Sequence, residues 1–137
     1  MILNVYFDAS FYYDTKTAVI AVRIINTKKN VFISVKKVLC NNSTEAELRA
    51  LNKIINYIDV KQNSGLIPLN CEIIIRGDNK GVIDSVNKHR HIRCVEKGIM
   101  VNLLNRFNHL KKLNSVKLIW INRKYNSETD KLTRSIT

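Results

Sequence analysis

The spacing of apolar residues predicts that the chain opens with β-strands. Three segments alternate apolar and polar residues or are rich in β-branched side chains, at residues 2–9, 17–25 and 30–39. In the first, Leu3, Val5 and Phe7 fall on one face, because successive side chains of a strand point to opposite faces. The polar break at residues 26–29 is short and typical of a hairpin. The sequence therefore predicts three antiparallel strands in succession.

A helical period begins near residue 44 and alternates with strands thereafter. Leu48, Leu51, Ile55 and Ile58 form one apolar stripe of the first expected helix. Helices are expected at 44–58, 80–86, 94–111 and from 126 or 127 to 134, and strands at 71–76 and 116–121. The order βββαβααβα, without repeats or a linker, predicts one α/β domain over residues 1–137, with a five-stranded mixed sheet flanked by helices.

Two kinds of residue are expected to add to the core. Trp120 lies in the last apolar strand, which favours burial. The cysteines Cys40, Cys71 and Cys94 are odd in number, widely spaced and without a CxxC pair. This pattern indicates neither a disulfide framework nor a zinc site, so we expect the cysteines to act as small hydrophobic residues.

The charge balance points to a polyanionic partner. Lysine and arginine number 23 against 11 acidic residues, giving a formal net charge of +12. Such a charge suits nucleic acid, an anionic membrane surface or an acidic protein. No amphipathic cationic helix of the membrane-binding kind is evident, so nucleic acid is the favoured partner and no membrane association is expected. Without a recognisable signal peptide or spanning segment, a cytoplasmic location is expected.

Against this basic background, helical geometry separates two neighbouring acids. The positions four, seven and eleven residues after Glu47 are all apolar, so Glu47 faces or borders the sheet. The same positions after Glu45 are Arg49 and two asparagines, so Glu45 is expected on a solvated face, paired with Arg49. A buried charge without a partner costs roughly several kcal/mol, so Glu47 requires an explanation that Glu45 does not.

Each of three aspartates occupies a position that either a catalytic role or an ordinary structural role would explain. Asp8 and Asp78 each follow an apolar strand, and their carboxylates would meet at one edge if those strands are parallel neighbours. Asp78 could equally cap the next helix, and Asp8 could be a turn residue. Asp130 lies in the first turn of the last helix, where the helix dipole alone favours a carboxylate.

The chain resembles type 1 ribonuclease H, or a close member of the ribonuclease-H-like superfamily. The resemblance is carried by Tyr6-Phe7-Asp8-Ala9-Ser10, by residues 41–51 (NNSTEAELRAL), by Arg76-Gly77-Asp78-Asn79 and by residues 120–132 (WINRKYNSETDKL). Each motif is short, but their order and spacing match the family, and so does the order of elements. The resemblance therefore spans nearly the whole chain and implies a ribonuclease-H-like fold.

The resemblance implies a specific activity. It assigns Asp8, Glu47, Asp78 and Asp130 as catalytic ligands of two Mg²⁺ ions, with Mn²⁺ as a substitute, and places Asp8 between the two ions. Two such ions about 4 Å apart can hold the scissile phosphodiester for in-line attack by water. The expected reaction is hydrolysis of the RNA strand of an RNA–DNA hybrid, leaving a 5′-phosphate and a 3′-hydroxyl. No protein partner is required.

Nucleic-acid contacts are also implied. The residues that match such positions are Asn41, Asn42 and Asn79 for the minor groove, Lys88, Arg90 and Arg93 for a basic protrusion that grips the DNA strand, and Arg123, Lys124 and Asn126 near the last helix. Other roles remain open from the residues alone. The basic stretch could be a solvated loop, Asn42 a turn or cap residue, and Asn126 the cap of the last helix.

Two departures from the family pattern bear on activity. Residues 10–15 contain no glycine, whereas many members have a glycine-rich segment there. Residues 120–130 contain no histidine, so the chain is closest to the short plant reverse-transcriptase-like form that lacks the catalytic-loop histidine. Two alternatives therefore stay open: a catalytically weak module that binds hybrid or double-stranded RNA, and a structure-specific DNA nuclease of the same superfamily.

Overall fold

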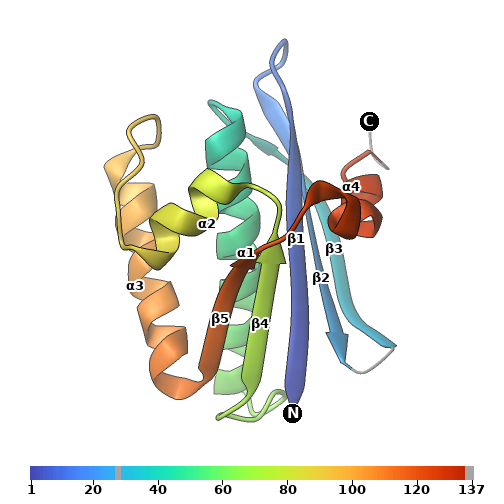
Figure 1. Ribbon diagram of the computed structural model, residues 1–137, viewed down its shortest axis with the longest axis vertical. Helices are drawn as coiled ribbons and strands as arrows, with labels where there is room; N and C mark the ends of the chain where they lie inside the picture. The colour runs from blue at the N-terminus through green and yellow to red at the C-terminus, as the bar shows by residue number, and fades with distance from the viewer. Residues whose placement is uncertain (27–28, 135–137) are drawn as a thin grey trace.

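The computed structural model describes residues 1–26 and 29–134 and contains one sheet with helices on both faces (Figure 1). The strands are β1 Ile2–Tyr12, β2 Thr17–Asn26, β3 Lys29–Leu39, β4 Glu72–Gly77 and β5 Ser115–Trp120. The helices are α1 Ser43–Asn63, α2 Lys80–Asn87, α3 Lys97–Leu113 and α4 Ser127–Leu132, the last preceded by a 3₁₀ turn, η1 Arg123–Asn126. The predicted order of strands and α-helices is confirmed. The turn predicted between β2 and β3 centres on residues 27–28, outside the described residues.

The sheet is mixed, as predicted. Its five strands lie in the order β3-β2-β1-β4-β5. β1–β2 and β2–β3 are antiparallel, whereas β1–β4 and β4–β5 are parallel. The parallel register pairs Tyr6 with Arg76, which places Asp8 and Asp78 two residues beyond the same rung. The expectation that these two acids share one edge of the β1–β4 pair is confirmed.

The prediction that β1 ends near Asp8 is wrong. The strand continues to Tyr12, because residues 8–12 keep their pairing with β2, from Asp8 opposite Ala21 to Tyr12 opposite Thr17. Residues 10–15, which contain no glycine, therefore form the end of β1 and the hairpin turn that follows it. Asp8 therefore lies in the middle of β1. Only the parallel pairing with β4 stops before it.

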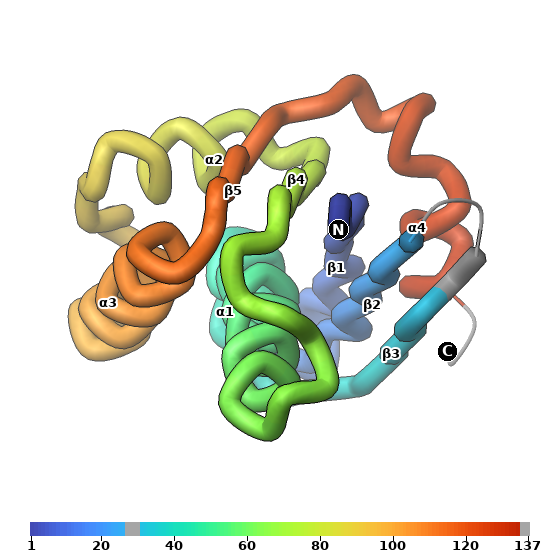
Figure 2. The backbone as a smooth tube through the Cα atoms, turned by 90° about the horizontal axis from the view of Figure 1, so that it is seen from below, coloured from blue at the N-terminus to red at the C-terminus, as the bar shows by residue number. Residues whose placement is uncertain are grey.

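Helices cover the two faces of the sheet unequally. Figure 2 shows α1 and α3 together on one side of the sheet and the short α4 on the other. Leu3, Val5 and Phe7 of β1 pack in the core with apolar residues of α1 and α3, including Leu51 and Phe107. Because β2 lies between α1 and α4, its residues from Ala18 to Ile24 are buried regardless of the face to which they point.

Glu45 is buried, which corrects its predicted place on a solvated face. The predicted pair with Arg49 is present, at 3.4 Å between Nε and Oε2. The carboxylate also folds back over the start of α1, where it accepts hydrogen bonds from the backbone N–H and the side-chain amide of Asn41. Burial acts to raise the pKa of Glu45, but these hydrogen bonds and Arg49 leave it below its usual value. Helical counting gives the direction of a side chain but not this capping contact.

Trp120 and Cys94 are exposed, so their predicted burial is wrong. Trp120 is 44% exposed because it ends β5, the edge strand of the sheet. Cys94 lies in the loop between α2 and α3, and this loop is longer than predicted because α3 begins only at Lys97. Cys40 and Cys71 are buried, as expected. Across the described residues, no helix combines the length and apolar character needed to cross a membrane.

Candidate metal centre

Three of the four predicted carboxylates converge at the carboxyl end of the parallel strands. Asp8 comes from β1, Glu47 from the N-terminal part of α1, and Asp78 from the residue that follows β4. One oxygen atom of each lies within 4.8 Å of the others. Oxygen atoms from three carboxylates at this spacing are the ligand set that Mg²⁺ or Mn²⁺ prefers.

The carboxylates leave oxygen atoms directed at no protein donor. Asp8 and Glu47 are 2% and 6% exposed, and Asp8 Oδ2 and Glu47 Oε2 are buried without a hydrogen-bond partner in the described structure. Burial, and then the charge of Asp78, raises the pKa of Asp8 to about 7. Burial, followed by the charges of Asp8 and Asp78, raises the pKa of Glu47 well above its usual range. A bound cation would compensate these unpaired oxygens, so the residues present fit a metal ion.

Asp130 lies near this group without joining it. It is on α4, its Oδ2 forms an ion pair with Arg134 at 3.2 Å, and its charge contributes to the raised pKa of Asp8. Its Oδ1 is buried without a hydrogen-bond partner in the described structure. Asp130 therefore offers a free oxygen at the border of the three-carboxylate cluster.

Asp78 is positioned by contacts that sequence reasoning missed. A Cβ atom on Gly77 would approach the Phe7 ring to 2.5 Å, so only glycine lets β4 end this close to β1. The indole N–H of Trp120 donates to the backbone oxygen of Asp78 at 3.1 Å. Asn79, not Asp78, caps α2, accepting from the Val82 N–H at 3.1 Å. The carboxylate of Asp78 therefore stays available to the centre.

Asn126 occupies the predicted N-cap position of α4, but its side chain makes no capping hydrogen bond and instead orients the centre. Its amide nitrogen donates to Phe7 O and to Asp78 Oδ2, each at 3.0 Å. The residue is 1% exposed. A buried amide that links the backbone of β1 to the Asp78 carboxylate fixes the separation of Asp8 and Asp78.

A buried arginine anchors the helix that carries Asp130. Arg23 of β2 donates from Nε to Thr129 Oγ1 at 3.1 Å and from Nη1 to Glu128 Oε2 at 2.9 Å. On β1, Ser10 Oγ lies 2.8 Å from Thr133 Oγ1. Nothing in the local pattern of β2 distinguishes Arg23 from a surface residue, because its partners are more than 100 positions away in the chain.

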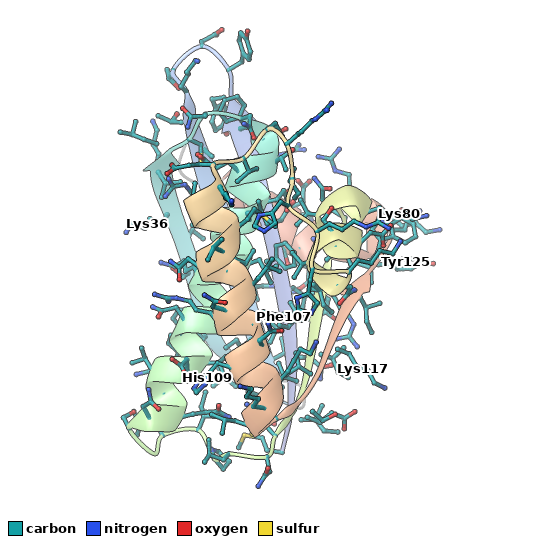
Figure 3. The ribbon with its side chains drawn as sticks, turned by 90° about the vertical axis from the view of Figure 1, so that its left-hand side faces the viewer. Lys36, Lys80, Phe107, His109, Lys117 and Tyr125 are labelled. Atoms are coloured by element: carbon teal, nitrogen blue, oxygen red, sulfur yellow. The ribbon has the colours of Figure 1, made fainter. Side chains whose placement is uncertain are left out.

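An open groove of about 600 Å³ exposes the centre to solvent. Its lining includes Glu47, Asp78, Asn79, Arg123 and Lys80, of which Lys80 was not predicted. In Figure 3, Lys80 and Tyr125 both lie at the right-hand margin of the view. Lys80 and Arg123 thus bring positive charge into the same groove as the carboxylates, an arrangement that can bind an anion beside a metal ion.

The remaining predicted nucleic-acid residues do not line this groove. Asn42 caps α1 by accepting from Glu45 N at 2.8 Å, and its amide nitrogen donates to Cys94 O at 2.8 Å. Asn41 is engaged by Glu45. The other four are exposed: Lys88, Arg90 and Arg93 in the loop between α2 and α3, and Lys124 in η1 with its ammonium over the Tyr125 ring.

Comparison with solved structures finds several RNase H1 structures with a similar fold. LC11-RNase H1, isolated from compost by a metagenomic approach, superposes with a TM-score of 0.76 at 17% identity, covering 96% of this chain and 92% of that one. The same enzyme in complex with an RNA/DNA hybrid gives 0.72 at 17% identity, covering 96% and 94%. RNase H1 from the halophilic archaeon Halobacterium salinarum gives 0.73 at 16% identity, covering 98% and 96%. At these identities the likeness shows the fold.

The sequence itself supplies the family. A search of curated protein sequences finds no match. The model of the reverse transcriptase-like family, however, matches residues 6–136, nearly the whole chain. The chain therefore belongs to the reverse transcriptase-like family of the ribonuclease-H-like superfamily.

Proposed function

We propose that this protein is a Mg²⁺-dependent endonuclease that hydrolyses the RNA strand of RNA–DNA hybrids, leaving a 5′-phosphate and a 3′-hydroxyl. The observation that carries the proposal is the convergence of Asp8, Glu47 and Asp78 within 4.8 Å, with buried oxygens lacking protein partners, beside an open groove. The hybrid is the proposed substrate because a neighbour of the same fold has been solved with an RNA/DNA hybrid.

The four carboxylates have distinct roles in the proposal. Asp8, Glu47 and Asp78 would hold one ion, and Asp130, with its unpartnered Oδ1, would contribute a ligand to a second. When bound, such ions make a water molecule acidic enough to attack at neutral pH and neutralise charge on the phosphodiester. Because metal binding requires ionised carboxylates, the raised pKa of Asp8 makes metal affinity increase as the pH rises through about 7.

The other residues of the groove bind and orient the substrate. Lys80 and Arg123 line the groove, and we assign them to contacts with phosphate oxygens of the substrate. Asn79 also lines the groove, although its side-chain oxygen already caps α2, which leaves its amide N–H groups to donate. Asn126 acts through Asp78, holding that carboxylate toward the centre.

A cleavage assay with matched variants tests the proposal. Wild type is compared with Asp8→Asn and Asp78→Asn on a labelled hybrid with Mg²⁺, and Asp14→Asn, in the exposed hairpin turn, is the control. Removing a ligand charge should lower the rate by at least about 100-fold, while the control keeps the wild-type rate. Equal rates in all four proteins, or cleavage by none, would contradict the proposal.

One observation favours a second candidate, a catalytically weak module that binds hybrid or double-stranded RNA. Arg134 already occupies one oxygen of Asp130, and Asp130 lies outside the three-carboxylate cluster. This candidate predicts salt-sensitive binding with negligible cleavage. A wild-type rate that disappears in Asp8→Asn excludes it, and cleavage that is indifferent to the 2′-hydroxyl would indicate a DNA nuclease instead.

A further inference from the structure

A second groove with a cationic lining lies on another side of the molecule. Its volume is about 290 Å³, and its charged lining residues are Lys36 of β3, Arg49 and Lys53 of α1, and Arg106 of α3. None of its described lining residues is acidic, and none also lines the groove at the metal centre. In Figure 3, Lys36 lies on the opposite side of the view from Lys80.

Most of these charges have no counter-ion in the protein. Arg49 pairs with Glu45 at 3.4 Å, but no carboxylate of the described residues forms an ion pair with Lys36, Lys53 or Arg106. The Arg106 guanidinium donates to Asn56 of α1, which holds it at the groove. Burial, and then the charge of Lys36, lowers the pKa of Lys53. An anion in the groove would relieve this repulsion between like charges.

The positive charge continues along α1 beyond the groove. A second hollow of about 210 Å³ shares Lys53 and Asn56 with the first and is lined further by Phe32 and Tyr57, whose rings stack at 3.7 Å. Beyond it the Lys61 ammonium lies 5.5 Å from the Tyr57 ring centroid. The cations of α1 therefore follow one another along the helix.

The length of this row favours a polymer over a small anion. From Arg49 to Lys61 the helix advances twelve residues, about 18 Å at about 1.5 Å each. One strand of B-form DNA places a phosphate every 3.4 Å or so along the axis, so about five phosphates fit this length. A free phosphate or a single acidic side chain would use only one end of it.

We propose that these five cations, named here the α1 track, bind the phosphate backbone of a nucleic acid at a site separate from the metal centre. The α1 track comprises Lys36, Arg49, Lys53, Lys61 and Arg106. Choosing a nucleic acid over an acidic protein rests on the proposed function. The α1 track is a second binding site for a long substrate and takes no part in the hydrolysis.

Chemical footprinting tests the site directly. Lysines are acetylated in EDTA, which prevents cleavage, with and without a hybrid of about 30 base pairs, and each site is read by mass spectrometry. Acetylation of Lys36 and Lys53 should fall several-fold with the hybrid, while that of Lys112 and Lys117 stays unchanged. Unchanged labelling of Lys36 and Lys53 would overturn the proposal. Equal protection by pyrophosphate would assign a small-anion site, and equal protection by polyglutamate an acidic-protein site, and either result also overturns it.

Paired variants then separate the track from net charge. Lys36→Gln/Lys53→Gln and the control Lys112→Gln/Lys117→Gln remove the same charge from different elements. The first pair should weaken binding of the long hybrid about tenfold at low salt and reduce the slope of log K against log salt by about 1 to 2, with the cleavage rate at saturation unchanged. Equal effects in both pairs would contradict the track. If the hybrid still protects Lys36 and Lys53 but neither wild type nor any variant cleaves it, the proposed function fails and the α1 track stands.

Discussion

Buried oxygen atoms without donors identify the metal centre more sharply than the charge of its residues does. Glu45 and Glu47 are both buried, yet every oxygen of Glu45 has a donor, whereas Glu47 Oε2 has none in the described structure. Burial acts to raise the pKa of both, but hydrogen bonds and Arg49 bring that of Glu45 below its usual value, whereas the charges of Asp8 and Asp78 raise that of Glu47 further. For these two glutamates, the presence or absence of hydrogen-bond donors therefore separates the structural acid from the candidate ligand.

The raised pKa of Asp8 predicts an unusual pH dependence of stability. Folding moves this pKa from 3.8 to about 7, so between these values the folded state binds more protons than the unfolded chain. The free energy of unfolding of the metal-free protein should therefore fall as the pH rises from about 4 to about 7. Thermal melts in EDTA should show Tm decreasing by several degrees across this window.

Two comparisons control this pH prediction. Asp8→Asn should flatten the profile, because it removes the titrating group and one charge that acts on Glu47. Asp14→Asn, which is exposed, should keep the wild-type slope. Added Mg²⁺ should raise Tm more as the pH passes about 7, where Asp8 ionises and is free to bind it. A profile that rises with pH in the metal-free wild type would refute the assignment.

At the scale of elements, the centre depends on how closely β1 and β4 approach. Phe7 fills the space beside Gly77, and the next residue of each strand is a carboxylate of the site. On the other face, Arg23 ties α4 to β2 through Thr129 and Glu128. The packing of strands sets the Asp8–Asp78 spacing, and this buried arginine sets the position of Asp130.

Substitution of Gly77 should therefore disturb stability and site together. Gly77→Ala places a methyl group 2.5 Å from the Phe7 ring, and overpacking of this kind costs about 1–3 kcal/mol. We expect a lower Tm and weaker Mn²⁺ binding by calorimetry. Gly81→Ala is the matched control: its nearest neighbour is at 3.6 Å and it lies in α2, so it should be neutral or stabilising by up to about 1 kcal/mol. If Gly77→Ala binds metal with wild-type affinity, the close approach of residue 77 to Phe7 does not position the site.

At the scale of the whole molecule, cationic surfaces surround an acidic centre. The net charge is +12, and the exposed cations Lys88, Arg90 and Arg93 lie in the loop between α2 and α3, away from the lining of the metal groove. Such charges contribute to the affinity for a polyanion and to its salt dependence, because binding releases counter-ions from the nucleic acid. In the proposed function, the carboxylates instead serve the chemical step.

Neutralising this loop should separate binding from catalysis. Lys88→Gln/Arg90→Gln/Arg93→Gln should weaken hybrid binding and reduce the slope of log K against log salt by up to about 3, with single-turnover cleavage at saturating enzyme nearly unchanged. Filter binding at several salt concentrations and a cleavage time course measure the two effects. A large loss of rate at saturation, with affinity intact, would place the loop in the catalytic machinery instead.

Hydrophobic periodicity predicted the order of elements and the mixed sheet, and it placed Asp8 and Asp78 at one edge only on the condition that their strands are parallel neighbours. The order of elements follows from local periodicity, whereas the parallel pairing of β1 with β4, which brings the two acids together, is a property of the sheet topology. Glu47 was also distinguished by its position on an apolar helical stripe. The capping role of Asn42, which had remained open, could not be decided in this way, because a cap depends on where the helix begins.

Which side chains meet depends on how the elements pack together. The partners of Asn126, Arg23 and Trp120 lie between 42 and 119 positions away in the chain, so no local pattern contains them. The exposure of Trp120 likewise depends on β5 being an edge strand, which is a property of sheet order. Periodicity predicts which face of an element is apolar. The burial of a side chain and its hydrogen-bond partners depend on what packs against that face. Because the packing residues are distant in the chain, no local pattern predicts them.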